Sequence, residues 1–242
     1  DTETHQVNQA TPSISATGGS FSFDGNPHAA TGFAYGIGGI GDVLTPAVTF
    51  TYTGSGATVY GPSATPPTNA GTYDVDVDFA GNTNYTSATT TTTITITIGL
   101  ANQTTTVTTS APVAAINGST FDVAATASSG LPVTISVSGV CTVADLVDGS
   151  VTDGDATVTM TSGTGTCSVF YDQAGDTNFN PAPQVQEDVT ATDSPVITSA
   201  NNASFDLGFV GTFNVTATGN PSIMVISVTG SLPTGIIFTD NG

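Results

Sequence analysis

The sequence predicts an all-β protein made of two complete β-sandwich domains in tandem and part of a third. The main observation is a turn-forming phrase that occurs twice: AGNTNY at residues 80–85 returns as AGDTNF at residues 174–179, an offset of 94 residues (174 − 80). A second pair, FDVAATA at 121–127 and FNVTATG at 213–219, repeats at nearly the same spacing (213 − 121 = 92). No segment shows a sustained helical period, so a repeated β module explains the length.

The repeat divides the chain into four parts. Residues 1–10 form a linker or a donor segment, residues 11–100 the first domain, residues 101–192 the second domain, and residues 193–242 a partial third domain. Each complete domain is long enough to bury its own core, because sandwiches of this kind need roughly 100 residues.

The clearest strands lie in the second half of the first domain. Apolar and acidic residues alternate from Tyr73 to Phe79, and Ile alternates with Thr from Thr93 to Ile98. Alternation with a period of two predicts strands with one face in a core and the other in water. The aspartates of the first strand, Asp74, Asp76 and Asp78, are therefore expected to be solvated and not to form a calcium row.

A glycine-rich run, GIGGIG at residues 36–41, is similar in spacing to a phosphate-binding loop. A dinucleotide-binding loop of this type follows a strand and opens a helix. The flanking segments here are rich in Thr and Val, which favours a flexible loop between strands.

Several phrases of the first domain occur together and in order. FDGNPH at 23–28, PTNAGTY at 67–73, the AGNTNY turn and the closing Thr/Ile strand resemble the MBG-type immunoglobulin-like (Ig-like) repeat of large bacterial surface proteins. The resemblance covers residues 11–98. It implies an Ig-like sandwich and a place in an extracellular or cell-surface repeat protein.

The rest of the chain resembles related modules. The segments at 127–133, 163–168 and 173–182, with a pair of cysteines, are similar to a second bacterial Ig-like repeat. The segments at 194–200, 213–221 and 230–235 resemble the start of a third type of Ig-like domain found in the same kind of protein. The fold class expected is thus tandem Ig-like β-sandwiches, two complete and one partial.

The charge balance excludes some partners. The chain has 19 Asp and Glu residues and no Lys or Arg. Nucleic acid is not an expected partner, because no cation is present to neutralise phosphate, and an anionic membrane surface is excluded for the same reason. No apolar run reaches the length of a membrane-spanning helix, so no membrane insertion is expected in this segment. Proteases that cut after basic residues have no site, and Lys–Asn cross-links are impossible.

Cys141 and Cys167 are the only cysteines, and both lie in the second domain. In an extracellular chain, two such residues predict a disulfide. A metal site needs more ligands than two thiols, and a redox pair usually reads CxxC.

The other candidate sites are acidic, histidine or asparagine residues. Asp145, Asp148, Asp153 and Asp155 lie near glycine-rich turns and form a calcium hypothesis, which is the one cofactor considered. His28 follows a turn proline and is expected to have a packing or turn role, as is His5. Five residues begin Asn-x-Ser/Thr sequons that would carry glycans only in an organism that glycosylates asparagine: Asn84, Asn102, Asn117, Asn202 and Asn214.

The function expected is structural: a segment of an extracellular bacterial repeat protein that forms a stalk or fibre of stacked Ig-like domains. The alternative is an adhesin module that binds glycan or a partner protein through the loop tyrosines Tyr35, Tyr52 and Tyr60. No catalytic residues are identified, and an enzyme is not expected; glycosidases need aromatic platforms, and the chain has no Trp.

The partners expected are neighbouring Ig-like modules or subunits of the same protein. The partial third domain would expose an apolar sheet face formed by Phe205, Leu207, Phe209, Phe213, Val215, Ile223 and Val225. Leaving such side chains in water costs about 1.5–3 kcal/mol each. Either further strands follow Gly242, or strands from another subunit complete the sandwich, with residues 1–10 as the natural donor.

Overall fold

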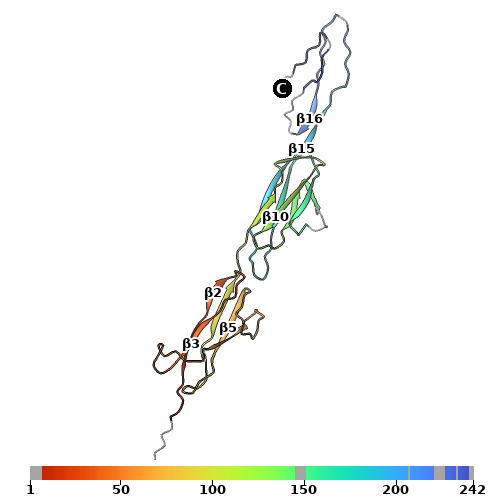
Figure 1. Ribbon diagram of the computed structural model, residues 1–242. Coiled ribbons are helices and arrows are strands. Elements are labelled where there is room, and N and C mark those ends of the chain that lie inside the picture. The colour runs from red at the N-terminus through yellow and green to blue at the C-terminus, as the bar shows by residue number, and fades with distance from the viewer. Residues whose placement is uncertain (1–6, 145–150, 207, 221–226, 233, 240–242) are drawn as a thin grey trace, which may run out of the picture. The chain divides into compact units, whose positions relative to one another are not determined.

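The computed structural model describes residues 7–144, 151–206, 208–220, 227–232 and 234–239 (Figure 1). Every regular element in these residues is a β-strand. The chain forms two compact units: unit 1 contains Asp1–Gln103 together with Ala174–Pro181, and unit 2 contains Thr104–Gln173 together with Ala182–Gly242. The expectation of an all-β chain is confirmed.

Unit 1 contains two sheets. A small sheet pairs β1 with β3, and a larger sheet has the order β2-β7-β5-β4, with β6 also paired to β5. The β2–β7 pair is parallel and the others are antiparallel. The strands are β1 (Ser13–Thr17), β2 (Gly19–Ser22), β3 (Thr31–Tyr35), β4 (Thr49–Gly54), β5 (Gly71–Phe79), β6 (Ala88–Thr89) and β7 (Ile94–Gly99).

The core of unit 1 lies between these two sheets. Tyr73, Val75, Val77 and Phe79 on β5 are all buried, whereas Asp76 between them is exposed. The other strands complete the core with Ala30, Ala34, Leu44, Val48, Tyr52, Ile96 and Ile98. The alternation predicted for both strands is confirmed, because each strand turns its apolar face to the small sheet and its polar face to water.

Unit 2 contains the strand order of an Ig-like sandwich. One sheet has the order β12-β13-β10-β8, and the other has the order β11-β14-β15-β16, with β9 paired in parallel to β15. Read as strands A to G, the sheets are D-E-B-A and C-F-G, the constant-type Ig arrangement. The strands are β8 (Thr105–Thr109), β9 (Ala114–Ile116), β10 (Thr120–Ala127), β11 (Thr134–Gly139), β12 (Cys141–Ala144), β13 (Asp155–Met160), β14 (Thr166–Asp172), β15 (Val185–Ile197) and β16 (Ala217–Asn220).

The predicted disulfide is present and crosses this sandwich. Cys141 opens β12 in one sheet, Cys167 lies on β14 in the other, and their Cα atoms are 5.5 Å apart. Both cysteines belong to a core that also contains Val123, Val158 and Tyr171. In terms of Ig strands the bond joins D to F, whereas antibody domains join B to F.

Strand β15 continues past the boundary predicted at residues 192 and 193. It pairs with β14 through Val185–Thr190 and with β16 from Asp193 to Ile197. The register of the pairing with β16 shifts between Asp193 and Val196, and Pro195 lies between these two residues. Proline has no N–H to donate, and a bulge is one of the few places where a sheet accepts it.

The region after β15 has little regular structure among its described residues. Strand β16 covers only the end of the repeated phrase at 213–219, whereas the first copy lies within β10. Phe205, Phe209 and Phe213 lie outside strands and are exposed, and Val215 is half-buried. Leu207, Ile223 and Val225 lie outside the described residues. In the described residues the phenylalanines therefore do not form the predicted sheet face, although they are exposed as expected.

Candidate functional site

The repeated phrase forms the same turn in both copies. In the first copy, the Oδ1 atom of Asn82 accepts hydrogen bonds from the N–H groups of Asn84 at 2.9 Å and Tyr85 at 3.0 Å. The Asn82 N–H in turn donates to the Tyr85 carbonyl at 2.9 Å. Gly81 precedes this Asx turn with a φ of 86°, a conformation that favours glycine.

The second copy replaces the turn asparagine with aspartate and keeps the geometry. Asp176 Oδ1 accepts from the N–H groups of Asn178 at 2.8 Å and Phe179 at 2.9 Å. The Asp176 N–H donates to the Phe179 carbonyl at 3.1 Å, and Gly175 has φ of 76°. Only a side-chain oxygen is needed to accept the two bonds, so Asn and Asp serve equally.

Each turn also binds an extended segment from earlier in the chain. The Ala10 N–H donates to the Asn84 carbonyl at 2.9 Å, and Ala10 forms a parallel bridge with Tyr85. Ala101 forms the matching parallel bridge with Phe179, and its N–H donates to the Asn178 carbonyl at 2.9 Å. The turn is therefore a receptor for one extended residue, and both copies are occupied in the same way.

A glutamine amide strengthens each of these attachments. Gln9 Nε2 donates to the Asn82 carbonyl at 2.7 Å, and Gln103 Nε2 donates to the Asn180 carbonyl at 2.8 Å. Gln103 is buried. The sequence pointed to the turn phrase but not to these glutamines or alanines, because neither pair has a distinctive local motif.

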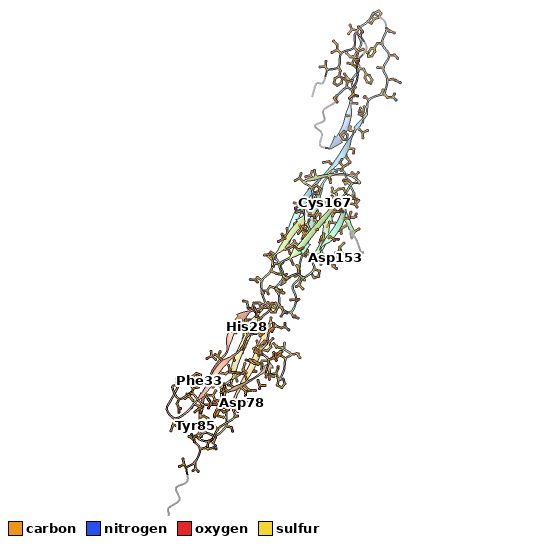
Figure 2. The ribbon with its side chains drawn as sticks, in the orientation of Figure 1. His28, Phe33, Asp78, Tyr85, Asp153 and Cys167 are labelled. Carbon is orange, nitrogen blue, oxygen red and sulfur yellow. A yellow bond between two sulfur atoms is a disulfide. The ribbon has the colours of Figure 1, made fainter. Side chains whose placement is uncertain are left out.

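The aromatic residue at the end of the phrase has a different role in each copy. The Tyr85 hydroxyl donates to Asp42 Oδ2 at 3.2 Å and accepts a bond from the Ile37 N–H at 3.2 Å. Figure 2 labels Tyr85. These two hydrogen bonds close the glycine-rich loop, and a Cβ at Gly36 would overlap both Tyr85 and Asp42. The run at 36–41 is thus a loop between strands, as predicted, but Tyr85 and Asp42 hold it in place. The close approach of these two side chains requires glycine at position 36.

Within unit 1, the second turn meets the loop that precedes β5. Asn178 Oδ1 accepts from the Ala70 N–H at 2.9 Å, and its Nδ2 lies 3.4 Å from Asn69 Oδ1. Phe179 packs edge-on against Phe23 with ring centroids 5.2 Å apart. A neutral amide and an aromatic ring therefore hold residues 174–181 in unit 1.

His28 has the packing and turn role expected of it. Its ring stacks on Phe21 with the ring centroids 4.1 Å apart, and its Nε2 lies 3.1 Å from Asp24 Oδ1. Figure 2 labels His28. The pKa of Asp24 is lowered, first by the backbone hydrogen bond from Asn26 and then by smaller effects that include His28. His5 lies outside the described residues.

The calcium hypothesis remains a prediction. Asp145 and Asp148 lie outside the described residues, Asp153 is exposed, and Asp155 is half-buried at the start of β13. Among the residues that the structure describes, no group of three or more His, Cys, Asp or Glu side chains is placed to hold a metal ion.

The tyrosines proposed for binding are not gathered on the surface. Tyr52 lies on β4 and not in a loop; it is 1% exposed and its hydroxyl accepts from the Ala30 N–H. Tyr60 is half-buried and donates to the Thr65 carbonyl at 2.7 Å. Tyr35 is half-buried on β3. These residues therefore pack mainly inside unit 1.

A partly buried polar contact in unit 2 was not predicted. The Tyr171 hydroxyl donates to Glu187 Oε2 at 2.7 Å, and the same oxygen accepts from the Ala111 N–H at 2.9 Å. Burial raises the pKa of Tyr171, and the hydrogen bond to Glu187 raises it further. Tyr171 and Ala111 lie 16 and 76 residues from Glu187 in the sequence, so no local sequence pattern predicts this contact.

The five sequon asparagines all lie on the surface. Asn84, Asn102, Asn117, Asn202 and Asn214 are exposed, which a glycan requires, and glycosylation itself stays a prediction.

No helix in the described part of the chain is long and apolar enough to cross a membrane.

Comparisons with known proteins give a general similarity only. No family model matches the sequence, and no curated protein matches it. Domains 4 and 5 of the S-layer protein SbsC are 18% identical with a TM-score of 0.30, over 75% of this chain and 99% of that chain. Three N-terminal domains of the bacteriophage RB49 outer capsid protein Hoc are 17% identical with a TM-score of 0.34, over 87% and 69%.

A third similar structure is the Escherichia coli adhesin FdeC, which is 19% identical with a TM-score of 0.28, over 81% of this chain and 70% of that chain. Scores this low carry no argument about function. The Ig-like assignment therefore rests on the strand order of unit 2, and the MBG-type resemblance remains a prediction.

Proposed function

We propose that this chain is a structural segment of an extracellular bacterial repeat protein, in which Ig-like domains in series form a stalk or fibre. The observation that carries the proposal is that the segments at the predicted domain boundaries are held by backbone hydrogen bonds. Ala101 is bound on both sides, by the Asn178 carbonyl and by the Asn180 N–H at 2.8 Å. Strand β15 runs unbroken across the predicted boundary of the third domain. Ordered connections of this kind suit a stalk, which has to keep its two ends apart.

Composition supports an extracellular place. A disulfide persists mainly in oxidising compartments, and Cys141 and Cys167 form one here. The absence of Lys and Arg removes every cleavage site for proteases that cut after basic residues. Both properties favour a long-lived protein outside the cell.

Exposed apolar side chains in the predicted third domain support assembly with other copies or domains. Phe209, Val210 and Ile237 are 80%, 101% and 87% exposed. Side chains of this size favour burial by about 1.5–3 kcal/mol each. Strand addition from a neighbouring domain or subunit would cover them. Gln9 and Ala10 are bound to the first turn, so a donor strand from this end would have to use the residues before them.

The tyrosines predicted for the adhesin alternative do not support it. Glycan-binding sites present exposed aromatic rings, whereas Tyr52 is buried and Tyr35 and Tyr60 are half-buried. The stalk is therefore the function that the geometry favours.

The test is antibody labelling of intact cells of the source organism, combined with the intact mass of the labelled protein under denaturing conditions. We expect labelling without permeabilisation. A mass well above 24 kDa would indicate a longer tandem-repeat protein, and a mass near 24 kDa with filaments would indicate assembly by strand addition. Labelling that appears only after permeabilisation would contradict the proposal.

A further inference from the structure

We propose that the first turn, residues 82–85, is a docking site for the end of another Ig-like domain that presents a loop like residues 69–71. The central residue is Asn84. This inference rests on the proposed function, because it assumes domains in series, and it specifies the residues through which a preceding domain would contact unit 1.

The argument begins with the equivalence of the two turns. Both use an Asx side chain to bind the same two N–H groups, and both form a parallel bridge with an alanine. Asn84 in the first turn therefore corresponds to Asn178 in the second. Each gives its main-chain carbonyl to the incoming alanine, at 2.9 Å in both cases.

The two asparagines differ in what their side chains bind. The Asn178 amide is half-buried and contacts Ala70 and Asn69, so it acts as acceptor and donor at once. The Asn84 side chain is exposed and makes no hydrogen bond among the described residues. The turn does not need this amide, because Asn82 Oδ1 accepts the bonds that hold it.

The partner chemistry follows from the second copy, whose asparagine side chain is hydrogen-bonded. An asparagine amide complements one free backbone N–H and one side-chain amide, which Ala70 and Asn69 supply to Asn178. This recognition needs no cation, and the chain contains no Lys or Arg for salt bridges between domains. The aromatic part of the contact differs, because Tyr85 is bound to Asp42 and Ile37 whereas Phe179 packs on Phe23. The amide is the element that both copies share.

The occupant is therefore an Ig-like domain with an Asn-Ala-Gly loop at the matching end. The first domain of this chain carries such a loop at Asn69–Gly71, and residues 174–181 occupy it. A second copy of the first domain, placed ahead of the chain, would bring a free loop of this kind to Asn84.

The experiment uses a tandem chain in which residues 7–100 are followed directly by residues 10–242. Ala10 of the second copy then takes the place of Ala101. One variant carries Asn69→Cys in the first copy and Asn84→Cys in the second. We expect an oxidised cross-link between them, detected by peptide mass after digestion with chymotrypsin. The reference is Asn69→Cys with Asn178→Cys in the natural chain, whose side chains are in contact.

A second measurement tests the energy of the contact. Asn84→Ala in the second copy of the tandem chain removes the amide. We expect the equilibrium constant for unfolding of the first copy to rise by about 2–10-fold, the usual effect of one hydrogen bond. The matched control is Asn84→Ala in the first copy, where no domain precedes the turn and no change is expected.

A cross-link in the natural chain without one in the tandem chain would overturn the proposal, as would equal effects of Asn84→Ala in the two copies. Either result, together with labelling of intact cells, would leave the stalk in place and refute only this joint. Labelling confined to permeabilised cells would instead refute the stalk.

Discussion

The disulfide of unit 2 allows a quantitative prediction with an internal control. Reducing the Cys141–Cys167 bond leaves every side chain in place but frees a loop with a sequence separation of 26 residues in the unfolded chain. On the chain-entropy model, closing a loop of this length stabilises the folded state by about 3.5 kcal/mol at 25 °C. We therefore expect unit 2 to lose about that amount when refolded in reductant. For a domain of this size, the loss corresponds to roughly 15–25 °C in Tm.

The assay is differential scanning calorimetry, with urea unfolding as a second measure. Unit 1 has no cysteine and supplies the control, because its transition is expected to stay where it is. Cys141 and Cys167 are both buried, so the protein must be unfolded and refolded in reductant to open the bond. A double substitution of both residues with Ala checks that the reductant itself has no effect.

Two results would refute this reasoning. A loss below about 1 kcal/mol in unit 2 would mean that the unfolded loop is already compact and gains little freedom. Equal shifts in both transitions would mean that the two units unfold as one, and that the division into compact units has no thermodynamic counterpart.

Three further predictions concern single features. Tyr171→Phe removes the bond to Glu187 and is expected to destabilise unit 2 by about 1.5–3 kcal/mol in urea unfolding. Because the pKa of Tyr171 is raised in the folded state, the stability of unit 2 should also fall above about pH 10, by about 1.4 kcal/mol per pH unit, and the variant should lose this dependence. Trypsin should leave even the unfolded chain intact, while chymotrypsin should cut the native chain first near Phe209, as seen by mass spectrometry; early cuts in the core of unit 1 would contradict the burial described. Ile96→Ala should destabilise unit 1 by about 2–5 kcal/mol, whereas Val59→Ala, at a 99% exposed site, should stay within about 0.5 kcal/mol; similar losses in urea unfolding would contradict the assignment of the core.

The sequence predicted features that depend on neighbouring residues. Alternation placed β5 and β7 with the correct faces, because a strand points successive side chains to opposite sides. The repeated phrase located both Asx turns, since the turn is made by residues within four positions of each other. The cysteines were correctly paired because the chain has no others.

Features that depend on distant residues could not be predicted in this way. The partner of Asn178 lies 108 residues away at Ala70, and nothing in either phrase specifies the other. The strands joined by the disulfide depend on the sandwich topology. Ser194 and Pro195 suggested a boundary, yet a bulge lets β15 continue through them, because pairing on both sides compensates for the missing N–H.

The parallel pairing in each unit has a mechanical consequence. In unit 1 the early strand β2 lies parallel to the last strand β7, and in unit 2 β9 lies parallel to β15. In a parallel pair, the start of one strand and the end of the other point to opposite ends of the sheet. A pull on the chain before β2 and after β7 would therefore slide the two strands along each other. All of the hydrogen bonds between them would then carry the load together, instead of breaking one after another as in a peeled hairpin. Tension would meet its greatest resistance at these pairs, before either core is exposed to water.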